Sequence, residues 1–116
     1  MKSTLYRFPG GSSNTVSDLD MKELADYLEE QGVTFYDWNI SSGDGSSVQL
    51  PVETLVDNCT KNIENWNTSI ILLHDSGDKR TTVDALPTII ENILAMEDTV
   101  ILPITEETKP VQHINQ

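Results

Sequence analysis

The chain has 116 residues, of which 19 are Asp or Glu and 7 are Lys or Arg, giving a formal net charge of -12. This length predicts one modest domain, and the hydrophobic content of 37% is enough to form a core. So acidic a surface repels phosphate backbones and anionic headgroups, which argues against binding to nucleic acid or to a membrane surface.

Targeting and membrane-spanning patterns are missing from this sequence. No apolar run of about 7 to 15 residues follows the N-terminus as in a signal peptide, and no run approaches the roughly 18 residues of a membrane span. The single cysteine, Cys59, has no CxxC or Cys/His cluster around it, so we expect no metal to be held by this chain.

Helical periodicity appears in three places. The first helix is predicted between Ser17 and Gln31, with Ser17 as its cap and Asp20 completing a capping box. The second begins near Pro51 and continues at helical spacing to Trp66. The stripe of this second helix includes Cys59, which we expect to be a small buried hydrophobe rather than a reactive thiol.

The third helix is predicted from Val83 to Leu94, with Pro87 in its first turn or marking a fresh start. Short apolar runs of strand length lie between the helices, at residues 5–6, 33–36, 69–73 and 99–102. Apolar and polar residues do not alternate within these runs, which is typical of parallel strands buried on both faces.

The chain is therefore predicted to be an α/β protein with about four parallel strands alternating with three helices. Two architectures fit this pattern: a small open sheet, or a piece of a larger (β/α) barrel, which typically needs about 250 residues. Residues 103–116 are polar, and we expect them to form a weakly ordered tail.

Polar side chains follow the carboxyl ends of three predicted strands. Arg7, Asp44 and His74 are the principal examples, and the carboxyl edge of a parallel sheet is where ligands bind. Histidine titrates near neutrality, so His74 is either a proton shuttle or a cap on its strand end. Arg7 either orients an anionic group or makes a strand-end salt bridge.

Two further features of this edge have a functional and a structural interpretation. The Pro-Gly-Gly sequence at residues 9–11 either lets backbone N–H groups approach a ligand or simply forms a turn. Trp38 either walls a sugar pocket or fills the core. His113 lies in the polar tail and is expected to have no function.

Three segments, in chain order, resemble motifs of the NodB-homology polysaccharide deacetylases, the group of chitin and peptidoglycan N-acetylglucosamine deacetylases. Residues 7–11 (Arg-Phe-Pro-Gly-Gly) resemble the third motif, residues 38–45 (Trp-Asn-Ile-Ser-Ser-Gly-Asp-Gly) the fourth, and residues 70–75 (Ile-Ile-Leu-Leu-His-Asp) the fifth. Ser41 and Gly45 depart from the fourth motif, which has Asp and Trp at these positions.

The resemblance implies a role for individual residues. His74 would be the general acid, Asp44 its carboxylate partner, and Arg7 would orient a catalytic aspartate. The substrate-binding residues would be Pro9, Gly10, Gly11, Trp38 and Leu72. Among them, the backbone N–H of Gly10 would donate to the oxyanion and Leu72 would face the acetyl methyl group.

The first and second family motifs, which supply the base aspartate and the Asp-His-His metal ligands, do not occur in the chain. The resemblance therefore implies that residues 1–116 are the C-terminal half of a deacetylase domain, a partial (β/α) barrel. The intact family domain would use a divalent metal, zinc or cobalt, and none is expected to be bound by this chain.

The expected function is thus part of a metal-dependent deacetylase acting on an amino-sugar polysaccharide, inactive as an isolated chain. Its partner would be the missing N-terminal half or a second copy, and the intact protein would act outside the cell or at the cell wall. The alternative is a non-catalytic glycan-binding or structural half-barrel that self-associates. A third possibility is an unrelated small open α/β domain. The sequence leaves open whether the polymer is chitin or peptidoglycan.

Overall fold

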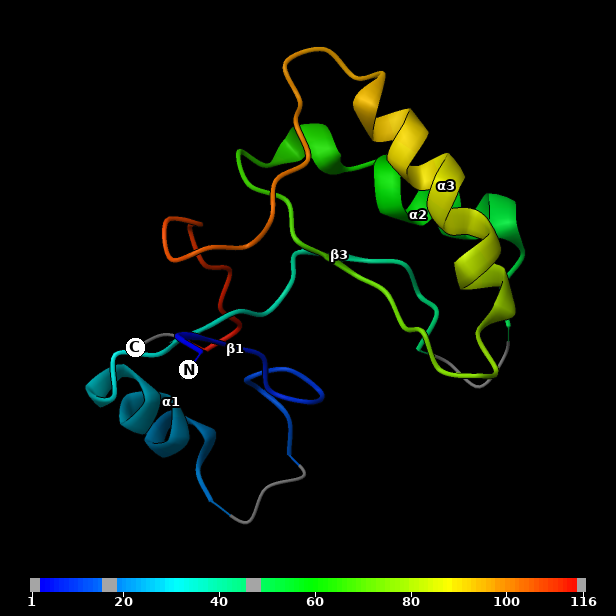
Figure 1. The fold of residues 1–116 in the computed structure, drawn as a ribbon. Helices are drawn as coiled ribbons and strands as arrows, with labels where there is room; N and C mark the ends of the chain where they lie inside the picture. The colour runs from blue at the N-terminus through cyan, green and yellow to red at the C-terminus, as the bar shows by residue number, and fades with distance from the viewer. Residues whose placement is uncertain (1–2, 16–18, 46–48, 115–116) are drawn as a thin grey trace. The chain divides into compact units, whose positions relative to one another are not determined.

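The computed structural model describes residues 3–15, 19–45 and 49–114, and Figure 1 colours its elements along the chain. The chain divides into two compact units. The terminal unit comprises Met1–Trp38 and Ile104–Gln116, and the central unit comprises Asn39–Pro103. None of the helices in the described ranges is long and apolar enough to cross a membrane.

The terminal unit contains a β-α-β arrangement. Strand β1 (Leu5–Tyr6) pairs in parallel with β2 (Thr34–Phe35), and helix α1 (Met21–Glu30) connects them. Helix α1 buries its apolar stripe in a small core. The buried residues of this core are Phe8, Met21, Ala25 and Phe35.

The start of α1 differs from the prediction. Asp20 is itself the N-cap, because its carboxylate accepts the Lys22 N–H at 3.0 Å. The capping-box role predicted for Asp20 is therefore wrong, and the predicted cap Ser17 lies outside the described residues. Gly32 follows the helix with a positive φ of 73°, a conformation that glycine commonly adopts where a helix ends.

The central unit repeats the β-α-β arrangement. Strand β3 (Ile40–Ser41) pairs in parallel with β4 (Ile71–Leu72), and the chain between them forms α2 (Val52–Thr60) and the 3₁₀ turn η1 (Ile63–Asn65). Helix α3 (Arg80–Leu94) follows β4 and packs along α2 (Figure 1). The buried core of this unit consists of Ile40, Leu55, Cys59, Ile63, Ala85, Ile89 and Ile93.

Several predicted boundaries in the central unit are wrong. Helix α2 ends at Thr60, and Trp66, which was predicted to continue it, is 50% exposed. Pro87 lies inside α3, which begins at Arg80. The apolar run at residues 99–102 forms no strand with any described residue, whereas Ile40–Ser41, where no strand was predicted, pairs with β4.

The coarse prediction is confirmed: the chain is an α/β fold with three helices and short parallel strands. The strands form two separate two-stranded ladders among the described residues, rather than one continuous sheet.

Candidate functional site

The central unit brings two predicted site residues together. His74, just after β4, has its Nδ1 at 2.6 Å from Oδ1 of Asp44. Its backbone N–H donates to Oδ2 of the same carboxylate at 2.7 Å. Asp44 is 3% exposed and the His74 side chain is 42% exposed. The pair therefore joins a buried carboxylate to an imidazole that solvent or a substrate can reach.

Both helices of the central unit hold the loop that carries Asp44. Thr82 of α3 donates its hydroxyl to Asp44 Oδ2 at 2.8 Å. Asn58 of α2 donates its amide to the carbonyl of Ser42 at 2.8 Å, and the Asp44 N–H donates to the Ser42 hydroxyl at 3.2 Å. The position of the carboxylate is thus fixed by hydrogen bonds from several elements rather than by its loop alone.

Burial and hydrogen bonding shift the pKa of Asp44 in opposite directions. Burial by itself raises the pKa of this carboxyl group, but hydrogen bonds from the His74 backbone and ring, Ser42 and Thr82 hold the pKa below its ordinary value of 3.8. Asp44 is therefore an anion at neutral pH, and the charge faces the His74 ring.

The backbone of Gly45 lies against the imidazole. A Cβ at Gly45 would be 3.2 Å from Cε1 of His74, so any larger residue would press on the ring. Gly45 is the position at which the resembled motif has tryptophan. Leu72, expected at the acetyl pocket, lies in β4 opposite Ser41 and is partly buried.

The terminal unit contains the other predicted site residues. Phe8 is buried in the core, and Gly11 closes a turn by donating its N–H to the Phe8 carbonyl at 2.8 Å. Gly10 has a φ of 79° at the third position of this turn, where a type II turn requires glycine. Pro9 and Gly10 are exposed, as is Arg7, which makes no hydrogen bond or ion pair with any described residue.

Trp38 lies at the end of the terminal unit and is only partly buried, so it does not fill the core. Its indole packs edge-on against the His113 ring, with centroids 4.8 Å apart. Asp44 and His74 thus lie together in the central unit, whereas Arg7, the Pro9–Gly11 turn and Trp38 belong to the terminal unit. That all of these residues form one site stays a prediction.

Sequence reasoning missed a second polar cluster, made by Ser12, Asp37 and His113 of the terminal unit. The buried Asp37 carboxylate accepts hydrogen bonds from both other residues. Asp37 directly follows the apolar run at residues 33–36, which is a local sign of a site residue. His113, however, lies 76 residues away in a polar segment, and nothing nearby in sequence indicates its partner.

Cys59 is completely buried, as predicted. Desolvation, and secondarily the charge of Asp44, raise the pKa of its thiol to about 11, so the thiolate is scarce at neutral pH. Cys59 therefore packs in the core as a small buried hydrophobe.

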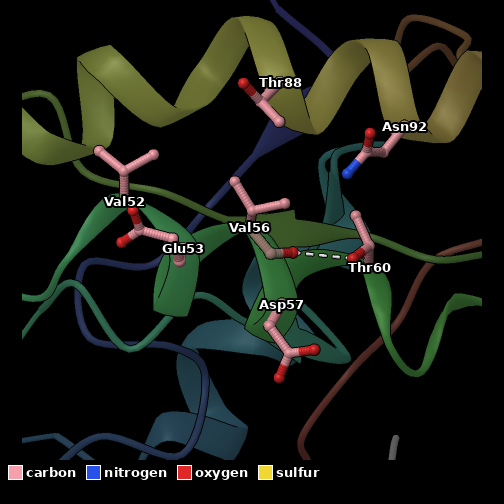
Figure 2. Close-up of a pocket in the computed structure, with 7 residues that line it drawn as sticks. All are labelled: Val52, Glu53, Val56, Asp57, Thr60, Thr88 and Asn92. Atoms are coloured by element: carbon pink, nitrogen blue, oxygen red, sulfur yellow. Dashed lines mark hydrogen bonds between the residues drawn. The ribbon is translucent and has the colours of Figure 1, made fainter.

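A groove of about 480 Å³ runs between α2 and α3 in the central unit. Figure 2 shows its lining side chains, with Val56 and Thr60 of α2 facing Thr88 and Asn92 of α3. The Thr60 hydroxyl donates to the Val56 carbonyl at 2.8 Å within α2. None of the predicted site residues lines this groove, so it is separate from the His74–Asp44 pair.

Three solved structures are similar to the chain. The catalytic domain of peptidoglycan N-acetylglucosamine deacetylase from Eubacterium rectale is 34% identical, with a TM-score of 0.85 over 95% of this chain and 50% of that domain. A CE4 esterase from Streptococcus mutans is 28% identical, with a TM-score of 0.63 over 80% of this chain and 40% of the esterase. A polysaccharide deacetylase from Bacillus cereus shares the fold at 24% identity, with a TM-score of 0.68 over 97% of this chain and 53% of that protein. No family model matches the chain, and no curated protein gives a significant match.

These comparisons give the class of protein to which the chain is similar, the polysaccharide deacetylases and CE4 esterases. The resemblance to the polysaccharide deacetylases that the three motifs predicted is confirmed. The chain spans about half the length of these solved structures, from 40% to 53%.

Proposed function

We propose that the chain supplies the general acid and the oxyanion loop of a polysaccharide deacetylase that removes N-acetyl groups from an amino-sugar polymer. The observation that carries this proposal is the His74–Asp44 pair, with its 2.6 Å contact between Nδ1 and Oδ1. The similarity to a peptidoglycan N-acetylglucosamine deacetylase supports the substrate class and favours peptidoglycan over chitin.

In this proposal His74 acts as the acid that releases the amine. Asp44 accepts the Nδ1–H hydrogen bond, which leaves Nε2 as the atom that carries the transferable proton. When the carbon–nitrogen bond of the tetrahedral intermediate breaks, the leaving amine takes the Nε2 proton and the acyl group departs as acetate. The anionic Asp44 stabilises the imidazolium before the transfer and holds the ring in its tautomer afterwards.

The turn at residues 9–11 would stabilise the oxyanion. The backbone N–H of Gly10 would donate to the developing negative charge, because an exposed glycine lets the substrate approach the chain closely. Arg7 would orient a catalytic aspartate that comes from the complementary half. Leu72 would contact the acetyl methyl group, and Trp38 would contact the sugar.

The intact enzyme would require a divalent metal, zinc or cobalt, but the donors among the described residues do not fit one. The described residues contain no group of three His, Cys, Asp or Glu side chains that could hold an ion. Of the two histidines, His74 is paired with Asp44, and His113 contacts the Trp38 carbonyl through Nε2 at 2.8 Å. Activation of the attacking water therefore falls to residues outside this chain.

We accordingly propose that residues 1–116 correspond to the C-terminal half of a polysaccharide deacetylase domain and form a partial (β/α) barrel, since the three motifs match the third to fifth of the family in order. The missing partner is an N-terminal half or a second copy, and the assembled enzyme would act outside the cell or at the cell wall. A non-catalytic glycan-binding half-barrel is the second candidate, favoured by the lack of a metal-binding group among the described residues.

The test is reconstitution with the complementary half of the Eubacterium rectale domain, produced separately and mixed with this chain and zinc or cobalt. Acetate release from an N-acetylglucosamine oligomer should appear in the mixture, and His74→Gln should lower the rate by about 100-fold or more. Asp75→Asn is the matched control, because Asp75 is the exposed neighbour of His74 and should leave the rate unchanged. An equal rate with His74→Gln would refute the proposed acid.

A further inference from the structure

Asp37 is a buried carboxylate that the proposed chemistry does not use. It is 1% exposed and lies two residues beyond the end of β2. Its Oδ1 accepts the Ser12 N–H at 2.8 Å, and its Oδ2 accepts the Ser12 hydroxyl and the His113 N–H, the latter at 2.6 Å. A buried carboxylate costs several kcal/mol unless its oxygens are satisfied, so a set of three donors is a built arrangement rather than a chance contact.

One side of this arrangement is the candidate oxyanion turn. Ser12 directly follows the turn at residues 9–11, and its two donors both reach Asp37. Gly11 fits tightly against the same residues: a Cβ there would lie 3.0 Å from the Trp38 ring and 3.5 Å from Asp37 Oδ1. The backbone of the turn therefore packs closely against Asp37 and Trp38.

The other side is the chain segment near the C-terminus. The Asp37 N–H donates to the Val111 carbonyl at 2.7 Å, while the His113 N–H donates to the Asp37 carboxylate. The His113 ring contacts the Trp38 carbonyl and packs against the indole. Asp37 thus connects two segments that are far apart in sequence, and both lie against Trp38.

We propose that Asp37 is a positioning residue: its carboxylate fixes the Gly11–Ser12 backbone, and hence the oxyanion turn, while anchoring the C-terminal segment at His113. The consequence for catalysis rests on the proposed function, whereas the positioning itself does not. Because the carboxylate accepts all three bonds, the turn and the C-terminal segment should loosen together when it is changed.

The test uses the full ¹⁵N-labelled chain and the variant Asp37→Asn, which keeps the shape, replaces one acceptor oxygen with an NH₂ group and removes the negative charge that all three donors face. Amide exchange at Ser12 and His113 should rise by about tenfold or more. Exchange at Tyr36, whose N–H donates to the Tyr6 carbonyl, should stay within about twofold. Asp26→Asn is the matched control, since Asp26 is an exposed carboxylate of the same unit.

Unchanged exchange at Ser12 and His113 would overturn the proposal, as would an equal rise at Tyr36, which would indicate only general loss of stability. If Asp37→Asn fails to fold, Ser12→Ala takes its place, because it removes one donor and leaves the carboxylate. Exchange at His113 should then rise by about threefold at an unchanged urea midpoint, and no rise would overturn the proposal.

A kinetic readout separates positioning from general stability. In the reconstituted mixture, Asp37→Asn should lower kcat by about tenfold and change KM by less than about threefold, because the oxyanion donor moves while most sugar contacts remain. An unchanged kcat would overturn the role in catalysis. If the unaltered mixture releases no acetate, the proposed function fails, and the exchange measurement alone decides whether Asp37 positions the turn.

Discussion

At the level of single residues, Asp44 and Asp37 show two uses of a buried carboxylate. Asp44 was predicted because it lies in a recognisable motif, and its partner His74 because it follows a predicted strand. Asp37 also lies shortly after a strand, but its partners come from a loop and from a polar segment near the C-terminus. Nothing local in the sequence identifies such long-range partners, which is why the contact between His113 and Asp37 was not predicted.

The hydrogen bonds to Asp44 predict an acid-dependent stability. Its pKa is lower in the folded chain than the ordinary value of 3.8, so the unfolded chain binds more protons as the pH falls. The stabilisation is fully present above about pH 4 and is lost as the pH falls through the folded pKa. Asp44→Asn should cost about 1–3 kcal/mol at pH 7, and its difference from the unaltered chain should shrink by pH 3.

Urea unfolding at a series of pH values measures this effect. Asp75→Asn provides the comparison with an exposed carboxylate from the same region. Parallel stability curves for Asp44→Asn and the unaltered chain across the acid range would contradict the account.

At the level of elements, periodicity found the three helices, but tertiary contacts set their ends. Pro87 was expected near a helix start, yet α3 begins at Arg80 and buries Ala85, Ile89 and Ile93 on both sides of the proline. Residues 99–102 have the composition of a strand, but a strand needs a paired neighbour, and Val100 and Leu102 are instead 71% and 73% exposed. Residues 40–41 form a strand because β4 lies beside them, not because of their own pattern.

The contact between α2 and α3 should dominate the stability of the central unit. Leu55 of α2 is completely buried among residues of both helices, so Leu55→Ala should lower the free energy of unfolding by about 2–5 kcal/mol. Leu86 of α3 is 41% exposed, and Leu86→Ala is the control, with an expected cost below about 1 kcal/mol. Urea unfolding followed by circular dichroism measures both, and equal costs would contradict the assignment of the core.

At the level of the whole molecule, α3 exposes apolar side chains that a solitary domain would cover. Val83, Leu86, Ile90 and Leu94 recur at helical spacing and are 40–62% exposed. Exposed apolar patches of this kind mark association surfaces. This exposure supports the prediction that a complementary half or a second copy covers these side chains.

The expected weak order of residues 103–116 stays a prediction, which amide exchange at His113 tests.

We therefore expect the pure chain to self-associate at micromolar concentration. Because the net charge of -12 opposes association between copies, added salt should strengthen it by screening the repulsion. Sedimentation velocity at low and high salt measures this, and a stable, well-folded monomer under both conditions would contradict the expectation.

We propose that this chain holds the acid of a deacetylase while the metal and the base come from elsewhere. The most direct test measures bound zinc or cobalt and acetate release together, first for the chain alone and then after addition of the complementary half. We predict neither metal nor acetate for the chain alone, and both for the mixture. Acetate release by the chain alone, with metal bound in a one-to-one ratio, would show that its own residues complete the site and would contradict the claim.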